Sequence, residues 1–149
     1  MPAPIDPHDR PGRRLIGAAT AFCRCAQLLH EHDEQSGAWA ICFVNLGFAI
    51  ELGLKGYLRE TGGSEKEQRG LRHDLLAAFR LAQSRGFVPS HPAQEQLIVE
   101  LNPHFKDMTL RYVEGTVIEL PPIEAAIQVV WMLLRELHEQ GGVADPEKT

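Results

Sequence analysis

Acidic and basic side chains follow one another at helical spacing in the middle of the chain. Glu51, Lys55 and Arg59 recur every four residues, so in a helix they lie on one face. On a solvated edge, the Glu-to-Lys pair is an ordinary surface interaction that contributes about 0.2–0.5 kcal/mol. In a partly buried pocket or a dimer seam, the same charges would order the bundle or hold a phosphate-bearing ligand. The spacing leaves both interpretations open.

A second polar pair, His73-Asp74, stands where a new helical pattern begins. A carboxylate at a helix start accepts hydrogen bonds from free backbone N–H groups, so helix capping alone can account for the pair. In the alternative, the pair joins the charged helix face and a later Arg-Tyr pair in one binding site, with Lys55 and Arg111 as phosphate donors. The residues of that candidate site are Glu51, Lys55, His73, Asp74, Arg111 and Tyr112.

Other ligand-type residues do not combine into a metal or cofactor site. The run His30-Glu31-His32-Asp33 lies where a helix should end, and no second ligand cluster pairs with it. Cys23 and Cys25 would lie about 200° apart on a helix and cannot easily hold one metal ion. The chain also lacks a phosphate-binding loop, a dinucleotide fingerprint and a zinc-protease motif. We therefore expect neither a metal nor a cofactor.

Composition indicates a soluble cytoplasmic protein. The 149 residues fit one domain, and the apolar and charged fractions of 44% and 23% are typical of globular chains. A net charge of −5 argues against broad attachment to nucleic acid or anionic lipid, although the basic segment 66–72 could be a local RNA contact or a solvated loop. No signal peptide is recognisable, the apolar run 38–50 is too short for a membrane span, and three cysteines fit a reducing compartment.

The elements that would position these residues are helices. Residues 1–11 carry four prolines and are expected to form a disordered arm, 12–141 a single up-and-down bundle, and 142–149 a flexible tail. Segment 65–70 is expected to be a solvated loop and 104–120 to be irregular or extended, with a turn at Glu114-Gly115. About five helices are predicted from the apolar periodicity, over 13–30, 37–60, 74–85, 92–101 and 121–140.

The helix predicted over 37–60 is the most apolar and should lie at the centre of the bundle. Ala49, Gly53 and Gly56 form a stripe of small residues along it. Each glycine inside a helix costs about 1 kcal/mol relative to alanine, so we expect another backbone to pack closely there. Further along the chain, Ser90 is the expected N-cap of the next-to-last helix and Pro103 its stop.

The order of several short motifs resembles the HEPN domains, which are helical bundles of toxin–antitoxin and defence systems. The motifs are FAIELGLKGYL (48–58), a glycine-containing loop, HDLLAAF (73–79), and LRY (110–112) before a terminal amphipathic helix. The resemblance covers roughly residues 15–140. It implies a homodimer, a nucleotidyltransferase or antitoxin as a partner, and RNA or a nucleotide as a ligand.

Ribonucleases of that family carry an Arg and a His that are separated by four to six residues. The His would move a proton and the Arg would stabilise phosphate charge. Arg24/His30 has this spacing but lies in the first helix, where the family does not place the motif. Arg85/His91 straddles a glycine and a proline, which predict a loop, and is the remaining catalytic candidate. Two such spacings are about what chance gives for this composition.

Three functions therefore remain open. The first is a non-catalytic binding or regulatory component of a nucleotide- or RNA-linked pathway, such as a toxin–antitoxin or defence module. The second is a metal-independent endoribonuclease that uses Arg85 and His91. The third is a structural bundle that binds a partner protein and no ligand. The chance-level count of Arg–His spacings favours the first.

Overall fold

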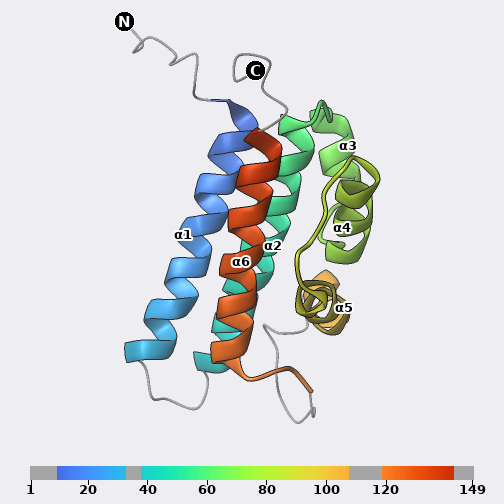
Figure 1. The fold of residues 1–149 in the computed structure, drawn as a ribbon. Coiled ribbons are helices and arrows are strands. Elements are labelled where there is room, and N and C mark those ends of the chain that lie inside the picture. Colours follow the sequence, from blue (N-terminus) through green and yellow to red (C-terminus); the bar gives the residue numbers. More distant parts are fainter. Residues whose placement is uncertain (1–9, 33–37, 108–118, 143–149) are drawn as a thin grey trace, which may run out of the picture.

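Helices make up the secondary structure of residues 10–32, 38–107 and 119–142, which the computed structural model describes (Figure 1). The expected all-α, single-domain bundle is confirmed. Arg111 and Tyr112, the turn at 114–115, most of the expected arm and nearly all of the expected tail lie outside the described residues. The helices are α1 Pro11–His32, α2 Ala38–Glu60, α3 Glu65–Gly70, α4 Leu75–Ser84, α5 Pro92–Lys106 and α6 Ile123–Gly142.

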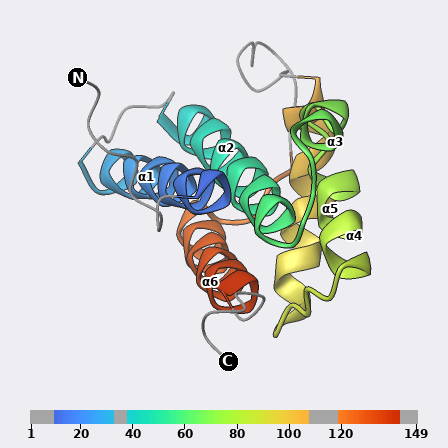
Figure 2. The ribbon, with the colours of Figure 1, turned by 90° about the horizontal axis from the view of Figure 1, so that it is seen from above.

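Helix α2 lies at the centre of this arrangement and contacts each of the other described helices. The long helices α1 and α6 lie beside it on one side, and α3, α4 and α5 lie on the other (Figures 1 and 2). Helix α5 runs across the long helices instead of alongside them. The predicted central place of the most apolar helix is confirmed.

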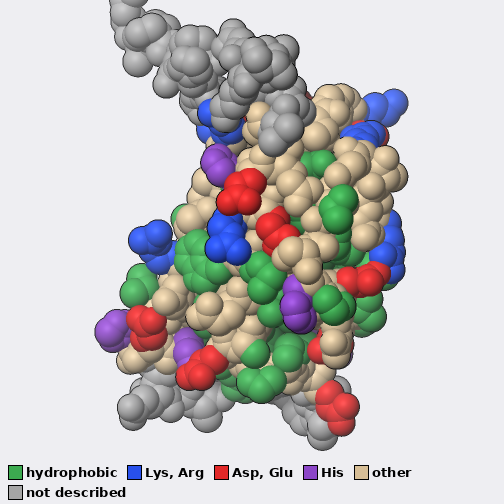
Figure 3. Space-filling model, viewed as in Figure 1, with side chains coloured by type: hydrophobic (Ala, Val, Ile, Leu, Met, Phe, Trp, Pro, Cys, Tyr) green, Lys and Arg blue, Asp and Glu red, His purple; other side chains and the backbone are tan. Residues whose placement is uncertain are grey.

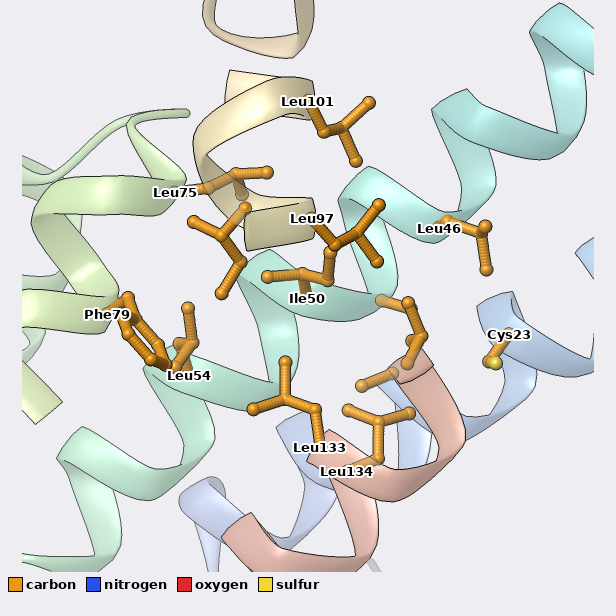
Figure 4. Packing of buried hydrophobic residues seen from close by; sticks show 14 of the residues in the cluster. Cys23, Leu46, Ile50, Leu54, Leu75, Phe79, Leu97, Leu101, Leu133 and Leu134 are labelled. Atoms are coloured by element: carbon orange, nitrogen blue, oxygen red, sulfur yellow. The ribbon is translucent and has the colours of Figure 1, made fainter. Parts of the chain in front are cut away.

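The hydrophobic core forms around α2 because its apolar residues point in several directions. Leu46, Ile50 and Leu54 are fully buried and meet Cys23 of α1 and Phe79 of α4, among others (Figure 4). Burying one such leucine or isoleucine contributes about 1.5–3 kcal/mol relative to leaving it exposed. Other buried members come from α5 and α6, and include Leu97, Leu101, Leu133 and Leu134.

The small residues on α2 allow close packing of neighbouring helices. At one position the neighbour is another backbone, and at the other it is a pair of side chains. A side chain at Gly56 would come within 2.7 Å of the Gly12 carbonyl oxygen and within 3.1 Å of the Ile16 nitrogen, both in α1. At Gly53 the neighbours are instead the side chains of Leu134 and Leu137 in α6. The expected backbone approach is therefore found at Gly56, while Gly53 makes room for leucines.

Helix ends show where local sequence rules were incomplete. Segment 65–70, expected to be a loop, forms the short helix α3, which begins because the Ser64 side chain accepts a hydrogen bond from Glu67 N–H. Helix α5 does not stop at Pro103 but continues to Lys106, and its N-cap is His91 and not Ser90. Asp74 caps α4, and Gly86, with φ +103°, follows the end of that helix.

By length and composition, residues Trp39–Glu60 of α2 could cross a membrane, and the other described helices could not. In the fold, 72% of the most apolar part of this helix is buried. Such burial is usual for the core helix of a globular protein, so the apolar character of α2 is accounted for by packing.

Candidate functional site

Three of the predicted site residues meet where α2 faces the turn before α4. Glu51 and Lys55 are only 6% and 8% exposed, so they are not on a solvated edge. Glu51 Oε1 lies 2.6 Å from His73 Nδ1 and 3.7 Å from Lys55 Nζ. Because an ionised carboxylate only accepts, Nδ1 of His73 carries the hydrogen in this contact. The predicted convergence of Glu51, Lys55 and His73 is present in the structure.

Lys55 also fixes the turn that carries His73. Its Nζ donates to the Arg72 carbonyl oxygen at 2.6 Å. Arg72 has φ of 51°, in the left-handed region that a residue with a side chain rarely adopts. The ammonium thus stabilises a strained backbone position directly before His73, and both of its described contacts are inside the protein.

Two aromatic rings also contact the ring of His73. The His73 ring lies edge-to-face against Phe48 and Phe105, with centroids 6.5 and 6.0 Å apart. Its side chain remains 45% exposed. His73 is therefore held on one ring edge by a buried carboxylate and by two aromatic rings, while part of the ring faces solvent.

Asp74 is the fourth member of the predicted set and acts as the N-cap of α4. Its Oδ1 accepts hydrogen bonds from Ala77 N–H at 3.0 Å and from Asn102 Nδ2 at 3.1 Å, and Lys106 Nζ lies 3.3 Å from Oδ2. Burial works to raise the pKa of Asp74, but these donors outweigh it and lower the pKa below its ordinary value. The capping interpretation is confirmed, and the carboxylate joins α4 to α5.

Arg85 of the candidate catalytic pair is engaged in an ion pair. Its two terminal nitrogens bond both oxygens of Glu67 at 2.5 Å each, which ties the end of α4 to α3. The hydrogen bonds and the charge of Arg85 lower the pKa of Glu67, and those of Glu67 raise the pKa of Arg85. The planar guanidinium matches a carboxylate in this fork-to-fork geometry.

His91 is engaged differently, as the N-cap of α5. Its Nδ1 accepts a hydrogen bond from Ala93 N–H at 3.0 Å. No hydrogen bond or ring contact joins Arg85 to His91 in the part of the chain that the structure describes. In the other pair of the same spacing, His30 Nε2 lies 3.1 Å from Glu124 Oε1, and Arg24 is exposed.

Grooves on the described surface lie away from the Glu51–Lys55–His73 cluster. Two of them, of about 370 and 390 Å³, run between α1 and α6. A further hollow of about 160 Å³ lies between α5 and α6. Within residues 10–32, 38–107 and 119–142, no group of three or more His, Cys, Asp or Glu side chains is placed to hold a metal ion.

Comparison with models of known protein families, with curated proteins and with solved structures finds no match for this chain. The HEPN resemblance consequently rests on the motifs quoted above. Of the six predicted binding residues, the structure places Glu51 in contact with both Lys55 and His73, and Asp74 follows His73 in the chain. It also adds neighbours that the sequence did not assign to this cluster. Phe48 and Arg72 adjoin the predicted residues in the chain, whereas Asn102, Phe105 and Lys106 come from α5.

Proposed function

We propose that this protein is a HEPN-like binding or regulatory component that does not cleave RNA. Its pathway would be linked to nucleotides or RNA, of the toxin–antitoxin or defence type, and its ligand would carry phosphate. The order of the motifs supports the family, and the all-helical bundle is compatible with the fold that the resemblance implies. A cytoplasmic location goes with this proposal and is supported by the composition and by the burial of α2.

The ion pair of Arg85 with Glu67 is the observation that favours a binding role over RNA cleavage. Both terminal nitrogens of its guanidinium are bonded to Glu67 at 2.5 Å, so a phosphate would have to displace a bidentate carboxylate. The Nδ1 atom of His91 is likewise used to cap α5. An Arg–His pair that cleaves RNA needs both groups on the reacting phosphate.

Within the predicted binding cluster, the residues take different roles. Lys55 orders the turn at Arg72, because its ammonium donates to that carbonyl. Glu51 positions the imidazole of His73. His73, with its half-exposed ring, is then the residue of the three that a ligand or partner can reach.

A homodimer and a nucleotidyltransferase or antitoxin partner belong to the same proposal. Support for an association surface comes from Leu28 of α1 and Ile41 of α2, each 49% exposed. Both lie at the same end of the α1–α2 pair, where Cys42 Sγ contacts the Ala26 carbonyl oxygen at 3.5 Å. Exposed apolar side chains on neighbouring helices are a usual feature of protein interfaces.

The test is an RNA cleavage assay with chelator present, run beside thermal unfolding with nucleotides and RNA. We expect no cleavage and a rise in melting temperature with one of these ligands. Metal-independent cleavage that is lost in His91→Asn would establish the ribonuclease instead, because asparagine keeps the helix cap and removes the imidazole. Absence of both effects, with a partner protein that co-purifies, would support the structural bundle and overturn the proposal.

A further inference from the structure

One of the two grooves between α1 and α6 is lined by residues 13–20 of α1 and 131–138 of α6, and we call it the upper groove. It combines an aromatic wall with basic side chains. Its apolar walls are Ile16, Trp131 and Leu134, and its basic side chains are Arg13, Arg135 and His138. Residues of α6 at positions 131, 134, 135 and 138 share one helix face, which is why they line the same hollow. Figure 3 views the face over α1 and α6, where basic, histidine and hydrophobic side chains lie near one another, with acidic side chains among them.

The charge of this groove contrasts with that of the whole protein. The chain carries a net charge of −5, yet none of the described residues that line this groove is a carboxylate. Arg135 is exposed, and neither it nor His138 makes a hydrogen bond or ion pair within the part of the chain that the structure describes. A guanidinium in this position can bind a phosphate through two parallel hydrogen bonds.

Trp131 is held in a defined orientation. Its Nε1–H donates to Gln27 Oε1 of α1 at 3.0 Å, and its ring is partly buried. A fixed indole beside an open groove offers a surface on which a planar ring can stack, and stacking on aromatic side chains contributes to the binding of bases of every kind.

The adjoining groove argues against a long polyanion. It continues along α1 and α6 with a volume of about 390 Å³ and includes Glu31 and Glu124 in its lining. These carboxylates would repel the next phosphates of an RNA strand that followed the two helices. The upper groove of about 370 Å³ falls in the range of small-ligand sites, roughly 300–1,000 Å³.

We propose that the upper groove between α1 and α6 binds a nucleoside monophosphate, with the base against Trp131 and the phosphate at Arg135 and His138. This inference rests on the proposed function, in which the ligand carries phosphate, and adds the site and the size of that ligand. The groove is formed by helices other than those that carry the Glu51–Lys55–His73 cluster, so the two sites can be tested separately.

Fluorescence of Trp131 provides a direct readout. The chain has two tryptophans, so Trp39→Phe leaves Trp131 as the single reporter. Nucleoside monophosphates, the matching uncharged nucleosides, inorganic phosphate and a short RNA would be titrated in turn. We expect a saturable change with a monophosphate, and binding at least about tenfold weaker with nucleoside or phosphate alone, since each makes only part of the contacts.

Two variants in this background test the groove itself. Gly17 lines it, and a Cβ atom built there would meet no atom within 4 Å, so Gly17→Leu introduces its side chain into the hollow from an open position. Arg135→Glu reverses the charge at an exposed position. We expect each to weaken binding about tenfold or more, whereas Gly17→Ala and Arg69→Glu, the same charge change on α3, should leave it unchanged.

The outcomes separate this inference from the proposed function. If wild-type protein binds a nucleotide and both Gly17→Leu and Arg135→Glu bind it equally well, the groove assignment is wrong and the proposed function stands. If the short RNA binds far more tightly than every monophosphate, the ligand size is wrong. If no nucleotide or RNA binds at all, the inference and the ligand of the proposed function fail together. Cleavage of RNA would overturn only the proposed function.

Discussion

Glu51 is the residue on which the buried cluster depends. Taking a carboxylate out of water costs several kcal/mol, and only nearby cations and donors offset that cost. Here the partners are Lys55 from the next turn of α2 and His73 from the turn before α4. The cluster therefore connects the central helix to the segment that presents His73.

Replacing Lys55 tests this dependence. Lys55→Met keeps the length of the side chain but leaves Glu51 without its ammonium partner and the Arg72 carbonyl without its donor. We expect a loss of about 3 kcal/mol of unfolding free energy, since removal of one partner from a buried pair is strongly destabilising. Urea unfolding with an unchanged m-value would measure it.

The double variant Glu51→Gln/Lys55→Met is the control for that prediction. Removing both charges should destabilise less than the sum of the two single changes, with a coupling of about 1–2 kcal/mol, because the residues are in contact. Strictly additive effects would show that Lys55 acts independently of Glu51, through packing or through its hydrogen bond to the Arg72 carbonyl. In that case the ion pair between Lys55 and Glu51 would contribute nothing to stability.

Only part of this cluster could be predicted from residue spacing. The four-residue interval between Glu51 and Lys55 dictates that they are neighbours, and His73-Asp74 carries a visible capping signal. The acceptor at Arg72 could not be predicted, because it depends on a left-handed backbone that arginine does not favour. Phe105 and Asn102 come from α5, and their place follows from how the helices pack.

At the scale of elements, the crossing of α1 and α2 depends on two glycines that face each other. A side chain at Gly12 would come within 2.6 Å of the Gly56 carbonyl oxygen, and one at Gly56 within 2.7 Å of the Gly12 carbonyl oxygen. Backbone atoms cannot move aside as side chains do. The helices therefore approach as closely as they do because neither position has a Cβ atom.

Gly56→Ala should destabilise the fold even though alanine is the better helix former. We expect a loss of about 2 kcal/mol, because overpacking forces α1 and α2 apart and outweighs the gain in helix propensity. Gly17→Ala is the matched comparison in α1, since its new methyl group would meet no atom within 4 Å. That variant should gain about 0.5–1 kcal/mol.

Thermal or urea unfolding of both glycine variants measures the difference. A stabilised Gly56→Ala would mean that the two helices can separate at little cost and that the close approach is not required. A destabilised Gly17→Ala would mean that alanine costs stability even where its methyl group meets no neighbour, so that close packing would not explain which glycines are required. Either result would contradict the packing argument.

Apolar periodicity predicted the long helices because their buried faces repeat over several turns. The short elements escaped prediction for a different reason. Helix α3 depends on a serine cap and on the ion pair of Glu67 with Arg85, a contact that joins it to the end of α4. Pro103 does not end α5 because it lies close to the C-terminus on an exposed side, where the loss of one backbone hydrogen bond is tolerated.

For the whole molecule, the sequence allowed the fold class to be predicted but not the surfaces. The all-α bundle follows from composition, periodicity and helix-end signals that agree with one another. The groove between α1 and α6 brings Arg13 together with Arg135, residues far apart in the chain that no motif joins. Sites of this kind become visible only once the helices are placed side by side.

The proposed homodimer can be tested through the apolar side chains that the bundle leaves exposed. Leu28 and Ile41 are each 49% exposed on α1 and α2, and Val88, which follows α4, is 68% exposed. If α1 and α2 form the dimer surface, Leu28→Glu/Ile41→Glu would place charges in an apolar contact and weaken association by at least about tenfold. Val88→Glu introduces the same charge at a distant site and should leave association unchanged.

Light scattering during gel filtration would give the mass of each protein over a range of concentrations. We expect a wild-type and a Val88→Glu protein of twice the chain mass, and a Leu28→Glu/Ile41→Glu protein that becomes a monomer on dilution while its thermal unfolding stays cooperative. A monomeric wild type would contradict the homodimer. A double variant that stays dimeric would move the interface away from this end of α1 and α2. Leu28 and Ile41 would then be available to a different protein, such as the proposed nucleotidyltransferase or antitoxin partner.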